Sequence, residues 1–361
     1  MKALLILEDG TVLEGKHHGS QQDVFCEIVF NTSMTGYQEV LTDPSYQGQG
    51  VIMTYPLIGN YGICERFSES EYPHVSALIT HEISDLDSHF ASEGKLDDYL
   101  IKYGVFGLSG IDTRALTRKI REHGTMMGYL TTRQMSYEDV DFTMTRDEDF
   151  VSQVTCQAPT HYSGSHYHVA LYDFGMKANI LRQFLQKGYE VTVFPAHTPA
   201  SVILSGNYDG IMLSNGPGDP KQCQSIIEEL KILYQSDIPI FAICLGHQLM
   251  ALANGFDTYK LKYGHRGANH PVMDLRNEKV YLSSQNHGYV VDGATIDETV
   301  AKPLFINVND KTNEGLLYLK RPMLSVQFHP EACPGPQDSC FLFEDFDTMM
   351  EEYKHAKESQ H

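Results

Sequence analysis

Residues 239–248 read Pro-Ile-Phe-Ala-Ile-Cys-Leu-Gly-His-Gln and continue into the apolar sequence Leu-Met-Ala-Leu-Ala. This pattern predicts a buried strand that turns sharply into a helix, with the Cys244 thiol at the junction. Ala242 and Gly246, two residues to either side, are small enough for such a turn. The first N–H groups of the helix would stabilise a thiolate and the oxyanion of an acyl-transfer intermediate. Cys244 is therefore a candidate nucleophile, although a cysteine among Ile, Leu and Ala is more often a small buried hydrophobe.

A glycine-rich motif follows another apolar strand. The sequence Ser214-Asn-Gly-Pro-Gly-Asp-Pro220 is either a tight turn or a rigid loop that presents backbone N–H groups to an oxyanion. Because Pro217 has no N–H, the donors within this motif would be Gly216 and Gly218. The Leu245 N–H, at the start of the helix after Cys244, would join them.

Two segments near the end of the chain complete the candidate site. The apolar run 323–328 leads straight into His329-Pro-Glu331, where Glu331 would hold the far nitrogen of the imidazole and fix its tautomer. The alternative is that His329 has a structural or surface role. The segment 283–291, Ser-Ser-Gln-Asn-His-Gly-Tyr-Val-Val, is predicted to be a loop between strands whose amide groups suit an amide ligand.

From residue 168 onward, short apolar runs alternate with helical patterns. The predicted strands are 169–173, 190–194, 210–213 and 238–243, and the predicted helices are 178–187, 225–234 and 245–254. This alternation predicts βαβ units in a parallel sheet, whose ligands bind at the carboxyl ends of the strands. The fold prediction is α/β: a doubly wound, mostly parallel sheet with flanking helices over residues 168–356.

The first part of the chain has a different pattern. Residues 1–150 are predicted to form a smaller α/β domain, with strands at 26–30, 51–55 and 77–80 and helices at 95–103 and 113–123. The segment 134–167 is polar and weakly periodic. It is predicted to be a hairpin or helix remnant, with 151–167 as the linker between the domains.

Composition excludes several classes of function. A net charge of −20 argues against nucleic-acid binding, and no apolar run is long enough to span a membrane. Seven irregularly spaced cysteines and an early acidic residue, Glu8, favour a reducing cytoplasm over secretion. No nucleotide-binding glycine motif is present, and His161, His166 and His168 lack partners at zinc spacing, so neither a cofactor nor a metal is expected in this chain.

Taken together, these motifs resemble those of the class I, triad-type glutamine amidotransferases. The segments that carry this resemblance are Ser214–Pro220, Ile243–Gln248 and Gln327–Glu331. Further segments are similar to the small subunits of carbamoyl phosphate synthases, and the resemblance covers essentially the whole chain. The segments similar to these small subunits are 30–39, 42–46, 54–62, 107–114 and 264–272. Three residues depart from the family pattern without removing a triad member: Ala242, Tyr289 and Cys333.

The resemblance implies a role for each matching residue. The catalytic triad would be Cys244, His329 and Glu331. The contacts to L-glutamine would be Ser45, Gly216, Gly218, Leu245, Gln248, Asn286, Gly288 and Tyr289. Ser45 comes from the first domain, which implies a pocket at the domain interface.

The resemblance also implies an activity and a partner. The chain would hydrolyse glutamine to glutamate and ammonia through a cysteine thioester. The ammonia would pass through a channel to a large subunit that makes carbamoyl phosphate from bicarbonate and two ATP, with ATP and Mg²⁺ bound there. The first domain would dock that subunit and form the start of the channel. The alternatives are a docking subunit with an idle site, a subunit of another synthetase, and a Cys–His peptidase. Whether the product enters arginine or pyrimidine biosynthesis is left open.

Overall fold

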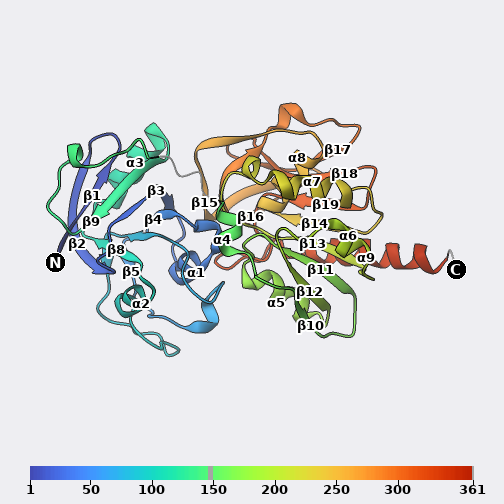
Figure 1. Cartoon of the computed structure of the whole chain (residues 1–361), viewed down its shortest axis with the longest axis horizontal. Coiled ribbons are helices and arrows are strands. Elements are labelled where there is room, and N and C mark those ends of the chain that lie inside the picture. Colours follow the sequence, from blue (N-terminus) through green and yellow to red (C-terminus); the bar gives the residue numbers. More distant parts are fainter. Residues whose placement is uncertain (145–148, 360–361) are drawn as a thin grey trace. The chain divides into compact units, whose positions relative to one another are not determined.

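The structure, a computed structural model, describes residues 1–144 and 149–359 (Figure 1). Two compact units divide the chain, Met1–Glu148 and Asp149–His361. The predicted linker, 151–167, differs from this division because its residues belong to the second unit. There α4 (Phe150–Val154) buries Val151, and β10 (Thr160–Tyr162) pairs with the sheet. The segment is polar because β10 is an edge strand with exposed side chains, not because it connects two domains.

The first unit is built around a closed β-barrel. Its strands follow the order β1 (Lys2–Leu7), β2 (Val12–Gly19), β8 (Phe106–Ser109), β6 (Ala77–Ile79), β4 (Gln49–Met53), β3 (Val24–Asn31) and β9 (Met126–Thr131). The barrel is narrow, so glycines stand where strands face its core. A Cβ at Gly50 or Gly128 would approach the Ile28 side chain to 2.9 and 2.5 Å. The predicted strands at 26–30, 51–55 and 77–80 fall on β3, β4 and β6.

Short helices and a small ribbon accompany the barrel. They are α1 (Tyr37–Thr42), α2 (Leu96–Tyr103), α3 (Thr113–His123), β5 (Leu57–Ile58) and β7 (Glu82–Ile83), with 3-10 turns at Pro44–Tyr46, Glu65–Phe67 and Tyr137–Asp139. The sequence predicted α2 and α3. Asp112 caps α3 by accepting the N–H of Ala115, and α2 ends at Gly104 in the left-handed conformation.

The second unit contains one large sheet. Its strands follow the order β10, β12 (Glu190–Pro195), β11 (His168–Asp173), β13 (Gly210–Leu213), β14 (Ile240–Ile243), β19 (Met323–Val326), β18 (Asn313–Tyr318), β17 (Ala301–Asn307), β15 (Thr258–Asp274) and β16 (Lys279–Val291). From β12 to β19 the strands are parallel, as predicted. From β19 to β16 they pair antiparallel, an extension that the sequence pattern did not predict.

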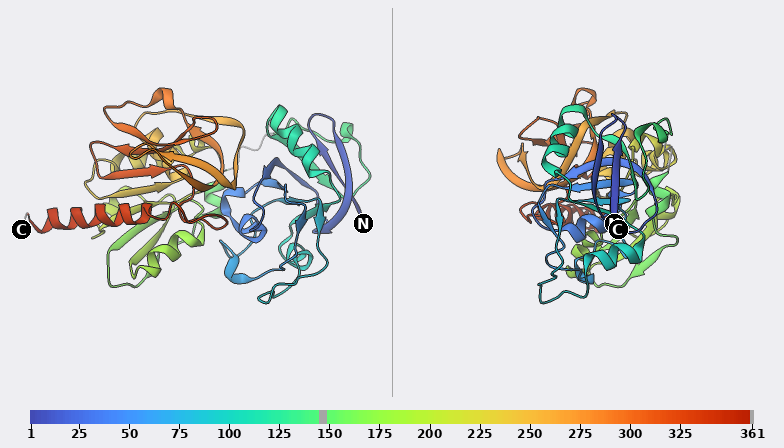
Figure 2. Two further views of the ribbon diagram at one scale, coloured as in Figure 1. Left: turned by 180° about the vertical axis from the view of Figure 1, so that it is seen from behind. Right: turned by 90° about the vertical axis from the view of Figure 1, so that its left-hand side faces the viewer.

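Helices cover both faces of this sheet (Figure 2). They are α5 (Ala178–Gln186), α6 (Ala200–Leu204), α7 (Gln224–Leu233), α8 (Leu245–Ala253) and α9 (Leu342–Glu358), with 3-10 turns at Pro220–Gln222 and Gly293–Thr295. Alternate residues of each strand face opposite cores. Ala170 and Tyr172 pack with α6, α7 and α8, whereas Val169 and Leu171 pack with α5 and α9. Among the described residues, no helix is both long and apolar enough to cross a lipid bilayer.

The sheet order positions the candidate site. The strands β13, β14 and β19 are adjacent and parallel, with Leu213 beside Ala242 and Ile243 beside Val326. Their carboxyl ends therefore meet at the same edge of the sheet. The three segments that leave these ends carry the glycine-rich motif, Cys244 and His329.

Candidate active site

Cys244 lies on a strained turn between β14 and α8. Its φ of 53° and ψ of −103° are in a region that residues with a side chain rarely adopt, a conformation that costs about 1–3 kcal/mol. A backbone hydrogen bond of 2.8 Å to Val326 holds the Cys244 N–H against β19. The thiol is buried and lies 3.7 Å from the backbone oxygen of Asn286. Such a turn places the sulfur atom at the carboxyl end of the sheet, as the sequence predicted.

The turn is held against the glycine-rich motif. A Cβ on Gly246 would lie 2.6 Å from the Leu213 carbonyl oxygen, and a Cβ on Gly216 would lie 2.7 Å from the Leu245 side chain. The Gly246 N–H also donates to the Ser214 oxygen at 3.1 Å. Only glycine allows these close approaches, so the motif after β13 and the start of α8 form one packed unit.

Replacing Gly246 by Ala is expected to lower the free energy of unfolding by about 1–3 kcal/mol, because the new methyl group overlaps the Leu213 backbone. Urea unfolding of the variant measures this loss. The matched control is Gly293→Ala, since a Cβ there meets nothing within 4 Å, and it should stay within about 0.5 kcal/mol of the parent. Equal effects in the two variants would show that this packing is not tight.

His329 and Glu331 lie together after β19. The His329 Nδ1 atom donates to Glu331 Oε1 at 2.6 Å, and both side chains are buried. The His329 backbone N–H donates to Ser284 on β16 at 2.9 Å. Burial disfavours a charged imidazole, but the Glu331 carboxylate outweighs it and raises the pKa of His329 well above its usual range. Glu331 therefore favours the charged form of the imidazole and holds its Nδ1.

The His329 ring also interacts with the Cys244 side chain. The Cys244 side chain is close enough to the ring to contribute to the raised pKa of His329. Within the described residues, His329 Nε2 makes no hydrogen bond of normal geometry, although it is buried. A buried nitrogen without such a bond is costly in a purely structural role. The structure thus brings the predicted thiol, imidazole and carboxylate together, while their catalytic roles stay predictions.

Lys177 is part of this site, and the sequence did not predict it. Its ammonium is buried at the start of α5, where it lies 3.1 Å from Glu331 Oε1 and also donates to the Ala332 backbone oxygen. Burial raises the pKa of Glu331, but Lys177 and His329 outweigh it and hold this pKa below its usual range. No sequence signal marks Lys177, because 154 residues separate it from Glu331.

The predicted loop at 283–291 is wrong, since these residues lie within strand β16. The polar side chains hid the strand pattern because they face the site and its supporting network instead of solvent. β16 contacts both residues, through the Ser284 oxygen to the His329 backbone N–H and through the Asn286 oxygen to the Cys244 thiol. The Gln248 amide donates to the Tyr289 oxygen at 2.7 Å, which ties α8 to the same strand.

The remaining predicted glutamine contacts divide between the units. Gly216, Gly218 and Leu245 lie at the ends of β13 and β14, and Gly218 has a φ of 92°. Gly288 lies in β16 between Asn286 and Tyr289. Ser45 belongs to the first unit, where it is buried in a 3-10 turn whose cap, Asp43, accepts its N–H. The contribution of Ser45 to a glutamine pocket stays a prediction.

A network of charged and amide groups connects β16 to the neighbouring segments of the sheet. His265 on β15 lies 2.7 Å from Asp310 and 3.5 Å from the buried carboxylate of Glu314, which also accepts the Gln285 amide at 2.9 Å. The His265 ring contacts the His287 ring at 5.0 Å. Burial disfavours a charged His265, but Asp310 and Glu314 outweigh it and raise its pKa to about 9.

Stability should therefore fall at alkaline pH. The folded-state pKa of His265 lies above the unfolded value of 6.5, so its contribution is complete below pH 6.5 and is lost as the pH rises through about 9. The expected loss is up to about 3 kcal/mol. Urea unfolding at several pH values measures it, and His265→Asn should flatten the profile, whereas a change at the exposed His355 should not. An unchanged profile in His265→Asn would contradict this assignment.

Comparison with known proteins finds a matching family for each of the two units. Residues 5–130 match the sequence model of the carbamoyl-phosphate synthase small chain, CPSase domain, and residues 170–349 match that of glutamine amidotransferase class-I.

Full-length relatives agree with these matches. The carbamoyl phosphate synthase small chain of Syntrophotalea carbinolica is 47% identical over 377 residues, covering 99% of this chain and 100% of the relative. Those of Bacillus cereus and Clostridium acetobutylicum are 50% and 46% identical, covering 98% and 96% of this chain and 97% and 99% of the relatives. The chain therefore belongs to the family of carbamoyl phosphate synthase small chains, with a class I glutamine amidotransferase domain as its second unit.

Proposed function

We propose that this chain is the glutaminase subunit of a carbamoyl phosphate synthase and that Cys244, His329 and Glu331 are its catalytic residues. The observation that carries the proposal is the strained turn that brings Cys244 to the His329 ring, whose far nitrogen is held by Glu331. A strained backbone is costly, and catalysis gives a reason for it at Cys244.

The first half of the reaction forms a thioester. Cys244 Sγ gives its proton to His329, and the resulting thiolate attacks the side-chain carboxamide carbon of L-glutamine, whose carbonyl oxygen becomes an oxyanion. The N–H groups of Leu245 and of Gly216 or Gly218 would bind this oxyanion, because all three lie at the ends of β13 and β14. His329 gives its Nε2 proton to the amide nitrogen, the C–N bond breaks and ammonia leaves.

The second half restores the enzyme. His329, now neutral, takes a proton from water, and the resulting hydroxide attacks the γ-glutamyl thioester. The C–S bond breaks, the departing thiolate takes back the proton from His329, and glutamate leaves after its new carboxylic acid has lost a proton to solvent. Throughout, Glu331 holds Nδ1, so the nitrogen that moves the proton is always the one beside Cys244.

Glutamine itself would be held by groups around this point. We assign the contacts to Gln248, Asn286, Gly288 and Tyr289, together with the oxyanion donors, and the family resemblance implies Ser45 of the first unit as a further contact. Support comes from Gln248, whose amide already bonds the Tyr289 oxygen and Gln327, so its position is set before a ligand arrives. Preorganisation of this kind lowers the cost of binding.

The ammonia is consumed by a partner in this proposal. A large subunit that binds ATP and Mg²⁺ would convert it, with bicarbonate, to carbamoyl phosphate, and this chain would need no cofactor of its own. The first unit would dock that subunit and begin the ammonia channel. We place the complex in the cytoplasm, a proposal supported by the absence of disulfides among the seven cysteines, all of which lie within residues 1–144 and 149–359.

The test uses the chain co-purified with the large subunit from the same organism. Glutamate release and carbamoyl phosphate formation are measured with glutamine or with ammonium chloride as nitrogen source. The proposal expects both activities, with glutamate and carbamoyl phosphate formed in step. If carbamoyl phosphate forms only from ammonia, the chain is an idle docking subunit, and if a different ATP-dependent enzyme co-purifies, it serves another synthetase.

A further inference from the structure

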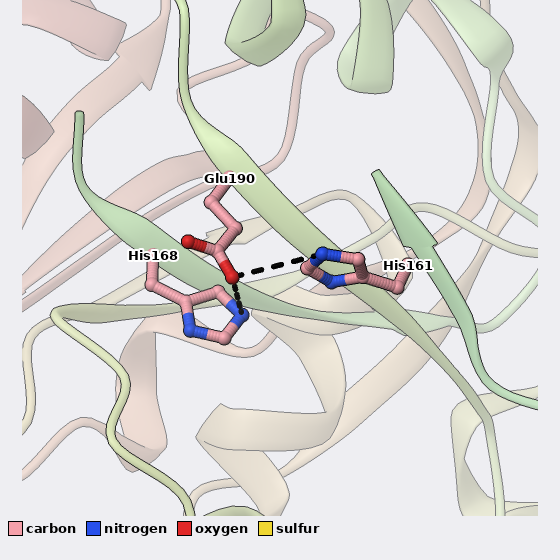
Figure 3. Close-up of side chains that lie close together, drawn as sticks. All are labelled: His161, His168 and Glu190. Carbon is pink, nitrogen blue, oxygen red and sulfur yellow. Dashed lines mark ion pairs between the residues drawn. The ribbon is translucent and has the colours of Figure 1, made fainter. Parts of the chain in front are cut away.

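Three potential metal ligands lie on neighbouring strands at the β10 edge of the large sheet (Figure 3). His161 is on β10, Glu190 on β12 and His168 on β11. The pairing places His168 directly beside Glu190 and His161 directly beside Thr192. Because Glu190 and Thr192 are two residues apart on one strand, all these side chains leave the same face of the sheet.

The sequence places no carboxylate at zinc spacing from these histidines, but the fold places Glu190 beside His161 and His168. The sequence spacing hid Glu190 because strand register, not proximity along the chain, brings it to His161 and His168. Both His161 Nε2 and His168 Nε2 lie 3.7 Å from the same oxygen, Glu190 Oε1. The two dashed lines in Figure 3 converge on that oxygen.

The distances suit a small divalent cation. The three ligand atoms all lie within 4.8 Å of one another. In a tetrahedral zinc site, with bonds of about 2.0–2.2 Å, ligand atoms are roughly 3.3–3.5 Å apart. The two nitrogen–oxygen separations thus need to close by only a few tenths of an ångström. The exposed His161 side chain and the half-buried His168 and Glu190 side chains can make such an adjustment by small rotations.

The surroundings orient the rings and leave access for an ion. The Thr192 hydroxyl lies 3.3 Å from His161 Nδ1, which directs His161 Nε2 toward Glu190, and the Tyr208 ring packs against His168 at 4.5 Å. Thr192 also lies 3.0 Å from His168 Nε2, so metal binding would draw that nitrogen away from the hydroxyl. The His161 side chain is 53% exposed, which opens the remaining coordination position to water.

A second group of possible ligands, His265, His287 and Glu314, is less suited to a metal. Its atoms are already engaged: Glu314 accepts from Gln285 and Asn307, and both nitrogens of His287 lie 2.8–2.9 Å from protein oxygens. This group is also buried, so an ion would have to displace those bonds. The His161, His168 and Glu190 group has fewer bonds to lose and is open to solvent.

We propose that His161, His168 and Glu190 form a surface site for a divalent transition-metal ion, Zn²⁺ in particular, with water as the fourth ligand. Two imidazoles and one carboxylate are a ligand set that Zn²⁺ binds well. The ion would tie the short edge strand β10 to β12 and β11, and so stabilise the second unit against opening at that edge.

The test is calorimetric titration of the full-length chain with zinc chloride at pH 7.5. All variants carry Cys244→Ala, so that the thiol of the candidate active site does not contribute. The parent should bind one more equivalent of Zn²⁺ than His161→Ala, His168→Ala or Glu190→Gln, or bind it at least about tenfold more tightly. The matched control is His166→Ala, an exposed histidine on the same segment, which should keep that equivalent.

Thermal unfolding gives a second readout. Zinc at a hundredfold excess over its Kd should raise the Tm of the parent and of His166→Ala by roughly 5 °C, but not that of the three ligand variants. Without zinc, the ligand variants should melt within about 2 °C of the parent, because the side chains lie at the surface. Equal zinc stoichiometry, affinity and Tm shift in His161→Ala and in the parent would overturn the site.

Discussion

Replacing Cys244 by Ser is expected to lower glutamine-dependent carbamoyl phosphate synthesis by at least about 10³-fold while ammonia-dependent synthesis stays near the parental rate. A hydroxyl at the same place is a far weaker acid than a thiol, so it gives its proton to His329 less readily and is a far weaker nucleophile. Ammonia supplied from outside bypasses the thioester, so the partner's reaction continues. The measurement is steady-state synthesis by the two-subunit complex with each nitrogen source.

The control for this variant is Cys156→Ser, a half-buried thiol in the same unit whose backbone N–H bonds Asp173. It should keep both activities, which separates loss of the nucleophile from a general effect of removing sulfur. If Cys244→Ser still used glutamine at a tenth of the parental rate, the thioester mechanism would be wrong. If it lost both activities, the defect would lie in assembly and not in chemistry.

The predictable part of the site consists of residues that directly follow an apolar strand. Cys244, Gly216 and His329 each come just after such a run, and the carboxyl ends of parallel strands gather at one edge of a sheet. Local pattern therefore predicted both the parallel sheet and the meeting of the thiol with the imidazole. Helix ends in the first unit were equally predictable, because Asp112 and Gly104 are local signals.

The unpredicted part depends on contacts between distant segments. Lys177 reaches Glu331 only after α5 has packed on the sheet, and Glu190 meets His161 only through strand register. The strand β16 was mistaken for a loop because its polar side chains, such as Gln285 and Asn286, are buried against partners and give no alternating pattern. The role of Ser45 was inferred from family resemblance alone, since nothing in its local sequence points to a ligand.

The second large effect is expected for Glu331→Gln, which should reduce glutamine hydrolysis by about 10²–10⁴-fold. The Glu331 carboxylate favours the charged form of His329 by raising its pKa, and it holds its Nδ1. With a neutral amide there, the pKa of His329 falls, and the ring is no longer a protonated acid at neutral pH. Activity should therefore survive best at acid pH, and the alkaline limb of the kcat profile should move to lower pH.

Lys177→Met supplies the matched comparison because it moves the same pKa in the opposite direction. The ammonium disfavours a second positive charge, so it lowers the pKa of His329. Removal of Lys177 should shift the alkaline limb to higher pH. It also takes a positive charge away from the neighbourhood of Glu331, which raises the pKa of that carboxyl group. Shifts of the same sign in the two variants would contradict an electrostatic role for this pair.

Unfolding measurements separate the contribution of the Lys177–Glu331 ion pair to stability from the contribution of Glu331 to catalysis. Glu331→Gln removes the carboxylate that the buried Lys177 ammonium faces and should lower the free energy of unfolding by about 3–5 kcal/mol, whereas Lys177→Met should cost less because His329 still pairs with Glu331. The double variant Lys177→Met/Glu331→Gln removes both charges and should lose less than the sum of the two. Its glutaminase activity should nevertheless stay as low as that of Glu331→Gln, because restoring charge balance does not restore the carboxylate that orients His329.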